Sequence, residues 1–322
     1  YTRLMTSRGC PVGCTFCEVE VISGGPFRYQ SPERVLKELE IFRTQYGIKS
    51  FMLDDDNFFV NRKRVKTILK AMLEQKIDME WKAHAVPVFH LDDEIVELMA
   101  KTGCRSVALA IESGSERVLK DIIRKPVKLN QVRQVCKKIK EVGMDLVANF
   151  IIGFPTETWE EIRQTFAFAE ELEIDYSKFF IATPLEGTIL HDMVIESNHL
   201  ASHSDTSGQM KDLDWSTSKI LSDEWTGNDL TVLRAYEWER INFSTPEKRK
   251  KLAFMLGINE QELGKLRKDT FSSVASNIIK SHQSENSGQE TSIDHHGDHR
   301  SVGAESYPGV KLDRDVPVSF GY

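Results

Sequence analysis

The chain has 322 residues, 40% of them hydrophobic, which is enough to bury the core of one large domain and a smaller one. Its 42 Lys and Arg against 49 Asp and Glu give a net charge of −7, which argues against a general nucleic-acid-binding protein. No apolar run reaches the length of a membrane span, and no stretch has the pattern of a signal peptide. Five cysteines, three of them clustered, indicate a reducing compartment, so we expect a cytoplasmic protein.

The chain begins at Tyr1, almost on its first predicted strand, so we expect it to be a piece of a longer protein. Strand-like apolar segments then alternate with helix-like segments up to about residue 190. Six strands are predicted, at about 3–7, 50–53, 79–85, 106–111, 146–152 and 177–182. Helix starts are predicted between them at Ser31 with Pro32, at Asn61, at Asp92 or Asp93, at Asn130, and at Thr158 with Glu161 in a capping box.

Repeated strand–helix units of this kind predict right-handed connections and a parallel sheet, which is an α/β fold. Pattern alone leaves two architectures open, a doubly wound open sheet and a full or partial barrel. In both of them, functional residues belong at the carboxyl ends of the strands. Marked residues do follow five of the predicted strands: the cysteine-rich loop, the acidic run from Asp54, Glu112, Gly153 and Thr183-Pro184.

The strand pattern ends near residue 196, and helices are then predicted at about 226–243, 246–256 and 260–280. We predict three regions: a core domain over 1–195, a helical extension over 196–281, and a disordered tail over 282–322 that is rich in Ser, Gly and His. The run from Asp294 to His299 is interpreted as part of this solvated tail, with a metal site as the alternative.

Three cysteines within eight residues, Cys10, Cys14 and Cys17, have the spacing C-x3-C-x2-C. A loop of this length can direct its thiolates onto one inorganic centre, and Gly13 permits the tight bend. Because no fourth cysteine lies nearby, three thiolates on a four-iron cluster would leave one iron open to a substrate or cosubstrate. There are two alternatives: the three cysteines supply most of the ligands of a zinc site, or they are ordinary thiols.

This spacing, with the aromatic Phe16 just before the last cysteine, resembles the signature of the radical SAM superfamily. The resemblance implies a partial (β/α)6 barrel, similar to a TIM barrel, to which the C-terminal helices are an extension. It also implies that Cys10, Cys14 and Cys17 hold a 4Fe–4S cluster and that S-adenosylmethionine chelates the open iron. Phe16 would then lie near the adenine of the cosubstrate.

The acidic run Asp54-Asp55-Asp56-Asn57 stands where many family members carry a motif that contacts the amino group of S-adenosylmethionine. It looks like the Asp-Asp-x-Phe version found in the branch that carries a cobalamin-binding domain before the barrel. A strand-end carboxylate can accept hydrogen bonds from an ammonium group. Which aspartate does so stays open, and a magnesium site or a solvated turn are the alternatives.

Later stretches carry the same resemblance. In 107–115, Glu112 would contact the cosubstrate with Ser113 beside it, because a carboxylate at the end of an apolar strand is costly unless it is paired. Of the pair Arg124-Lys125, Arg124 is the basic residue expected to hold the methionine carboxylate. The alternative is that both are ordinary surface residues. In 149–158, Gly153 permits a close backbone approach to the adenine. In 182–188, Glu186 replaces the usual second proline, so this loop is expected to differ.

Two further predictions concern single residues outside these motifs. Cys104 and Cys136 are too isolated in the sequence for a second cluster and are predicted to be small core residues. His84, near the end of the third predicted strand, is interpreted as structural, with an active-site position as the alternative.

The reaction implied by the resemblance is the one-electron cleavage of S-adenosylmethionine to a 5′-deoxyadenosyl radical, which abstracts hydrogen from a substrate that the sequence does not identify. The cluster potential must be very low for this reaction, so a flavodoxin- or ferredoxin-type reductant is the expected partner. One hypothesis is a cobalamin-associated methyltransferase or cyclase whose cobalamin domain, and with it cobalamin as a further cofactor, belongs to the full-length protein. The alternatives are a radical SAM protein without cobalamin and a non-catalytic zinc or iron–sulfur module.

Overall fold

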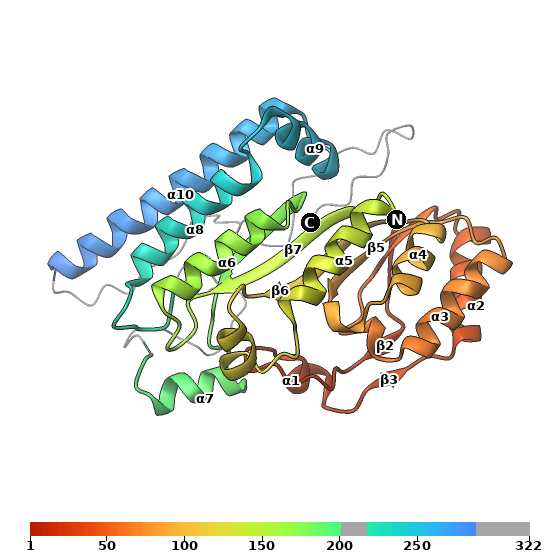
Figure 1. Ribbon diagram of the computed structural model, residues 1–322, viewed down its shortest axis with the longest axis horizontal. Helices are drawn as coiled ribbons and strands as arrows, with labels where there is room; N and C mark the ends of the chain where they lie inside the picture. Colours follow the sequence, from red (N-terminus) through yellow and green to blue (C-terminus); the bar gives the residue numbers. More distant parts are fainter. Residues whose placement is uncertain (201–217, 288–322) are drawn as a thin grey trace.

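The computed structural model describes residues 1–200 and 218–287, with side chains as far as residue 275 (Figure 1). Its six main strands are β1 (Thr2–Leu4), β4 (Ser50–Leu53), β5 (Glu80–Val86), β6 (Cys104–Glu112), β7 (Asp145–Ile152) and β8 (Tyr176–Ile181). They form one parallel sheet in the order β1-β4-β5-β6-β7-β8. Each strand therefore lies beside the next main strand along the chain.

The helices that connect successive strands are α2 (Pro32–Thr44), α3 (Arg62–Glu74), α4 (Asp93–Lys101), α5 (Leu129–Glu141) and α6 (Trp159–Glu171). After β8 follow α7 (Ile189–Glu196), α8 (Gly227–Asn242), α9 (Pro246–Leu256) and α10 (Glu260–Ser287). The short elements are α1 (Val19–Ser23), the antiparallel pair β2 (Ser7–Arg8) and β3 (Arg28–Tyr29), the 3₁₀ turns Phe58–Val60 and Val88–His90, and a π-helical turn at Val118–Ile122.

The strand order decides between the two architectures that the sequence left open. A doubly wound sheet reverses its strand order at a switch point, whereas this order runs one way from β1 to β8. The sheet is not closed, since no pairing joins β1 to β8 within the described residues. The α/β prediction of a partial, TIM-like barrel of six strand–helix units is therefore confirmed.

The helix starts follow the predicted capping residues. The side chain of Ser31 accepts a hydrogen bond from the backbone N–H of Arg34, with Pro32 at the first helical position of α2. Thr158 and Glu161 form the predicted capping box of α6. The last predicted helix is longer than expected, because α10 continues to Ser287 and so includes the first residues of the predicted tail.

The two faces of the sheet differ in burial. On β7, Phe150 and Ile152 are fully buried, while Asn149 and Ile151, which alternate with them along the strand, are partly exposed. β8 alternates in the same way, because successive side chains of a strand point to opposite faces. One face of the sheet packs against the helices and is buried in the hydrophobic core. The other face, which we call the concave face, is partly exposed to solvent on β7 and β8.

The C-terminal helices pack on the barrel. Figure 1 shows α8 and α10 lying alongside each other next to α6, and α8 also packs on β8. The side-chain amide of Asn242 accepts from the backbone N–H of Ser177 (2.8 Å) and donates to its carbonyl (2.9 Å). The indole of Trp225 donates to the carbonyl of Glu157 (3.0 Å). The extension therefore satisfies backbone groups of the edge strand β8 and of the turn after β7.

The predicted division at 195/196 and the predicted disorder after residue 281 stay predictions. The run from Asp294 to His299 lies outside the described residues. Among the helices that the structure describes, none combines the length and the apolar character needed to cross a bilayer.

Candidate functional site

The cysteine loop is anchored on the barrel at Thr15, which lies between Cys14 and Cys17. The backbone N–H of Thr15 donates to the carbonyl of Ile123 (3.1 Å), and its hydroxyl donates to the carbonyl of Ile122 (2.8 Å). The carbonyl of Thr15 accepts from the N–H of Leu190 at the start of α7 (2.8 Å). The loop after β1 is thereby fixed to the turn after β6 and to the segment after β8, so it spans the carboxyl edge of the sheet.

The three cysteines of this loop are free thiols and partly exposed. Burial raises the pKa of Cys14 to about 12 and also raises the pKa of Cys17. Thiolates are soft ligands that suit iron–sulfur clusters. Among the described residues no three His, Cys, Asp or Glu side chains converge as one metal ion would require. A cubane cluster needs less convergence, because each thiolate binds a different iron, and the donor set of the loop fits it.

The acidic run after β4 is divided between two roles. Asp55 accepts hydrogen bonds from the backbone N–H and the hydroxyl of Thr6 (2.5 and 2.6 Å) and from the hydroxyl of Ser7 (2.7 Å). Asp56 accepts from the N–H of Gly9 (2.7 Å). These two carboxylates hold the segment that leads into the cysteine loop. The structure places Asp54 differently: its partly exposed carboxylate forms an ion pair with Arg3 of β1, at 3.4 Å.

Next to them, Asn57 contacts the cysteine loop directly. Its buried side chain donates from Nδ2 to the Sγ of Cys10, at 3.3 Å. Its Oδ1 accepts from the backbone N–H of Phe59 (3.3 Å), which fixes the orientation of the amide. Asn57 therefore belongs to the site as a residue that contacts a cysteine sulfur.

At the end of β6, Glu112 has a buried partner. Its Oε1 lies 2.6 Å from the Nζ of Lys125, and the two residues are 5% and 6% exposed. Lys125 also donates to the carbonyl of Ala110 (2.9 Å). Glu112 has a φ of +73°, in the left-handed region that non-glycine residues adopt mainly at strained or functional positions. The sequence argument that this carboxylate must be paired holds, but the partner is Lys125, and Arg124 beside it is exposed.

The turn from β7 to α6 contains the predicted Gly153 and a fully buried carboxylate. Oε2 of Glu157 accepts from the backbone N–H groups of Gly153 (2.6 Å) and Phe154 (2.9 Å). Burial raises the pKa of Glu157 to about 8 in spite of these two bonds. A Cβ on Gly153 would lie 2.6 Å from a methyl group of Leu230 on α8. The glycine is therefore required by close packing of α8, whatever ligand approaches the turn.

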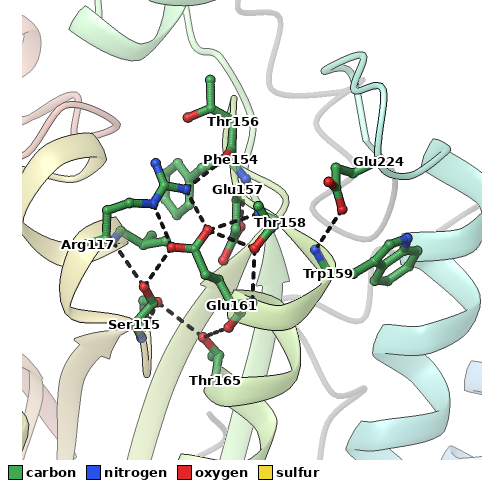
Figure 2. Close-up of polar contacts among 12 residues, drawn as sticks. Ser115, Arg117, Phe154, Thr156, Glu157, Thr158, Trp159, Glu161, Thr165 and Glu224 are labelled. Atoms are coloured by element: carbon green, nitrogen blue, oxygen red, sulfur yellow. Dashed lines mark hydrogen bonds and ion pairs between the residues drawn. The ribbon is translucent and has the colours of Figure 1, made fainter.

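Figure 2 shows how this turn is tied to the segment after β6. The guanidinium of Arg117 donates to both carboxylate oxygens of Glu161 (2.6 and 2.5 Å) and to the carbonyl of Thr156 (2.7 Å). The hydroxyl of Ser115 donates to Glu161 (3.0 Å). The Arg117 guanidinium holds the pKa of Glu161 at about 2. This charge-assisted network fixes the two strand-end loops of β6 and β7 relative to each other.

Two further predicted residues have clear positions. The hydroxyl of Ser113 is buried and lies 3.1 Å from the hydroxyl of Thr165 on α6, so it is engaged within the protein. The ring of Phe16 lies 6.1 Å from the ring of Phe154, centroid to centroid, which brings the cysteine loop and the turn after β7 together. The roles of these residues toward a cosubstrate stay predictions.

Comparison with known proteins identifies the family. The family model of the radical SAM superfamily matches residues 4–169, which is more than half of the chain. The chain belongs to the radical SAM superfamily. The radical SAM match begins in β1 and ends within α6, so it contains the cysteine loop and the ends of β4, β6 and β7 described above.

Two curated relatives each match more than half of this chain. The uncharacterized methyltransferase PH0819 of Pyrococcus horikoshii is 40% identical over 197 residues, which cover 61% of this chain and 42% of that protein. Cytidylyl-2-hydroxyethylphosphonate methyltransferase of Streptomyces wedmorensis is 34% identical over 195 residues, 58% of this chain and 36% of that protein. The chain thus spans about two fifths of the length of these relatives.

Among solved structures, the cobalamin-dependent S-adenosylmethionine radical enzyme OxsB, with aqua-cobalamin and S-adenosylmethionine bound, has a TM-score of 0.60. The match covers 89% of this chain and 50% of that chain at 16% sequence identity. At this identity the likeness shows the fold. Because it covers 89% of this chain, the fold likeness extends beyond residues 4–169, to which the family model is matched.

Proposed function

We propose that this radical SAM enzyme acts as the barrel of a cobalamin-associated methyltransferase or cyclase, with a 4Fe–4S cluster on Cys10, Cys14 and Cys17. The observation that carries the proposal is the anchoring of the cysteine loop across the carboxyl edge of the sheet through Thr15. The loop so anchored brings Cys14 and Cys17 within electrostatic range of the buried Glu112 and the ring of Phe16 to Phe154 in the turn after β7. Function in parallel barrels resides at this edge.

The chain's own residues bind and orient S-adenosylmethionine in this proposal. Asp54 is the carboxylate of the acidic run that can accept from the ammonium group, because Asp55 and Asp56 are committed to the segment before the cysteine loop. Phe16 and the backbone at Gly153 flank the adenine. Glu112, held by Lys125, presents its backbone and second oxygen to the ribose side of the cosubstrate.

The bound and reduced cluster would supply one electron that cleaves S-adenosylmethionine to methionine and a 5′-deoxyadenosyl radical. The protein contributes positioning and the exclusion of water around the reacting carbon. Two sequence relatives are named methyltransferases, and the solved neighbour is cobalamin-dependent, which supports methyl transfer or ring closure by the full-length protein. A flavodoxin- or ferredoxin-type reductant and a cytoplasmic location are part of the same proposal.

The test is anaerobic reconstitution with iron and sulfide, followed by iron analysis and by measurement of 5′-deoxyadenosine under dithionite. The wild-type chain should load one four-iron cluster and cleave S-adenosylmethionine, whereas the triple variant Cys10→Ala/Cys14→Ala/Cys17→Ala should do neither. Cys136→Ala, which changes a buried cysteine on α5, is the control and should behave as wild type. A triple variant that still loads the cluster would disprove the ligand assignment.

Cluster loading without cleavage of S-adenosylmethionine would favour the alternative, a non-catalytic iron–sulfur module. Zinc in place of iron in the anaerobically purified chain would favour the zinc module. The cobalamin assignment is tested separately, by isolating the full-length protein and measuring whether it retains cobalamin.

A further inference from the structure

The segment that holds the cysteines is the connection of a very short hairpin. Strands β2 and β3 pair antiparallel, with Ser7 opposite Tyr29 and Arg8 opposite Arg28, and residues 9–27 lie between them. An isolated two-stranded ribbon is only marginally stable even when it is longer than this. The base of the hairpin, where its two arms leave the barrel, therefore depends on contacts with the rest of the protein.

Arg64 in the first turn of α3 joins the two arms at this base. Its Nε donates to the backbone carbonyl of Gln30, at 2.9 Å, and its Nη2 donates to the backbone carbonyl of Thr6, at 3.2 Å. The backbone N–H of Gln30 donates to the same carbonyl of Thr6, at 2.9 Å. Because Thr6 directly precedes β2 and Gln30 directly follows β3, one guanidinium bridges both ends of the segment that contains the cysteines.

The Arg64 guanidinium also lies against two aromatic rings. Its Cζ is 5.4 Å from the ring centroid of Tyr29 on β3 and 5.4 Å from that of Phe58 in the 3₁₀ turn after the acidic run. A planar guanidinium stacks on aromatic faces and directs its donors in a fixed fork, whereas the ammonium of lysine is a point charge on a flexible stem. These surroundings therefore suit an arginine better than a lysine.

The two arms approach each other closely directly before the first cysteine. The carboxylate of Asp56 accepts from the backbone N–H of Gly9, at 2.7 Å. A Cβ on Gly9 would lie only 2.5 Å from the carbonyl oxygen of Pro26, in the stretch that leads back to β3. Cys10 follows Gly9, so its position depends on how the two arms are held together. The other two cysteines have a separate anchor at Thr15.

The burial of Arg64 is unfavourable for the fold alone. Only 4% of the residue is exposed, and its Nη1 is buried without a hydrogen-bond partner in the described part of the chain. A buried charge lowers stability unless its donors are paired, and an apolar residue of similar volume is often at least as stabilising. The first turn of a helix, with its partial positive charge, also disfavours a cation. Local choices that disagree with the fold in this way are expected at functional positions.

From these contacts we propose that Arg64 is a positioning residue for the iron–sulfur centre. By joining the carbonyls of Thr6 and Gln30, its guanidinium closes the base of the cysteine loop and sets where Cys10 lies relative to the other two cysteines. The inference rests on the proposed function and adds to it a residue outside the cysteine motif. Groups behind the ligands of a metal centre orient those ligands and tune the metal. An open base should therefore weaken cluster binding and change the electronic environment of the cluster.

The test compares Arg64→Met with wild type in two states of the chain. Methionine keeps apolar contact with the two rings but donates no hydrogen bond. In the cluster-free chain, amide hydrogen exchange over residues 5–30 should be about tenfold faster or more, the effect of losing a hydrogen bond to a charged group, and unchanged over β6 and β7. After anaerobic reconstitution, Arg64→Met should hold less iron and give an altered electron paramagnetic resonance spectrum. Lys63→Ala, which changes an exposed basic residue in the same turn of α3, is the matched control.

A second variant tests whether the guanidinium itself closes the base. Arg64→Ala lacks the part of the side chain that ethylguanidinium would replace, so this added ion should restore both slow exchange over residues 5–30 and iron loading. Ethylammonium has the same charge without the fork of donors and should restore neither. Equal rescue by the two ions would overturn the inference, because any cation would then close the base.

The outcomes separate this inference from the proposed function. If Arg64→Met loads a full cluster with the wild-type spectrum and exchanges at the wild-type rate, Arg64 has no positioning role and the enzyme assignment stands. Loss of cooperative unfolding in urea by Arg64→Met would also overturn the inference, because Arg64 would then hold the fold as a whole. A wild-type chain that never loads a cluster, together with faster exchange in Arg64→Met, would disprove the proposed function and leave the closure of the loop by Arg64 standing.

Discussion

Asn57 connects the acidic run after β4 to the cysteine loop through a single side chain. Its amide N–H groups face the Sγ of Cys10, and its carbonyl oxygen caps the 3₁₀ turn that follows. Hydrogen bonds to ligand sulfurs are among the features that set the reduction potential of iron–sulfur clusters. In the proposed assignment of Cys10 as a cluster ligand, the reduced cluster is the more negative state, so an N–H donor at this sulfur stabilises it relative to the oxidised state.

We expect Asn57→Ala to lower the midpoint potential of the reconstituted cluster by roughly 20–60 mV, which corresponds to one hydrogen bond of about 0.5–1.5 kcal/mol in a one-electron couple. Asn57→Asp keeps the oxygen that accepts from Phe59 but replaces the donor by a charge, so it should lower the potential further. A redox titration followed by electron paramagnetic resonance measures both shifts. Unchanged potentials at equal iron content would mean that the contact has no electronic effect.

The sequence predicted individual site residues where the residue type itself suggests a chemical role. The three cysteines and Glu112 are recognisable by type and by position after a strand. That Lys125 pairs with Glu112 was not accessible, because the turn after β6 has no periodicity, and the role of Arg124 toward the methionine carboxylate stays a prediction. In the structure Arg124 adopts a left-handed φ of +59° and is exposed, while Lys125 is directed to Glu112. For Asn57, the only indication in the sequence was its position directly after the three aspartates.

The turn between β7 and α6 places a carboxylate where water does not reach it. Glu157 is fully buried and bonds two N–H groups of its own turn, and its other oxygen has no protein hydrogen-bond partner. Its folded-state pKa is raised from 4.5 to about 8 by burial. Because the unfolded chain releases this proton near pH 4.5, the contribution to stability is fully present below that pH and is lost as the pH rises toward 8.

We therefore expect Glu157→Gln to gain stability relative to wild type as the pH is raised from 5 to 8, by roughly 3–5 kcal/mol in total. Glutamine keeps an oxygen that accepts from the N–H groups of Gly153 and Phe154 and has no charge to bury. Urea denaturation of both proteins at several pH values gives the difference. Glu160→Gln, an exposed change in the first turn of α6, is the control. A pH-independent difference between Glu157→Gln and wild type would show that Glu157 stays charged in the fold.

Elements with regular periodicity were predictable, and short irregular ones were not. The six strands and the helices between them follow from apolar spacing and capping residues such as Ser31 and Thr158. The pair β2–β3 and helix α1 were missed, because elements of two to five residues have too few positions to show a period. In the sequence, β2 directly precedes the cysteine loop, and α1 and β3 follow it.

At the scale of the whole molecule, the C-terminal helices complete the core of the barrel. Trp225, Leu230, Trp238, Ile241 and Phe243 are buried in the same hydrophobic cluster as β7 and β8. Burying one large apolar side chain stabilises a fold by roughly 1.5–3 kcal/mol, so five contribute about as much as the whole stability of a typical domain. The periodicity of the sequence predicted these helices, but their contacts with β8 and Gly153 depend on tertiary packing that it does not show.

The last prediction compares two truncated chains. A chain that ends at Ser287 should keep the melting temperature and the cooperative unfolding of the full chain, because residues 288–322 lack apolar periodicity. A chain that ends at Asn198 loses α8–α10, exposes the core side of β8 and leaves the backbone of Ser177 without Asn242. It should unfold without a cooperative transition in calorimetry or aggregate on expression, since an uncovered apolar edge strand pairs with other chains. If the shorter chain melted cooperatively at the temperature of the full chain, the barrel would fold independently and the C-terminal helices would be a separate domain.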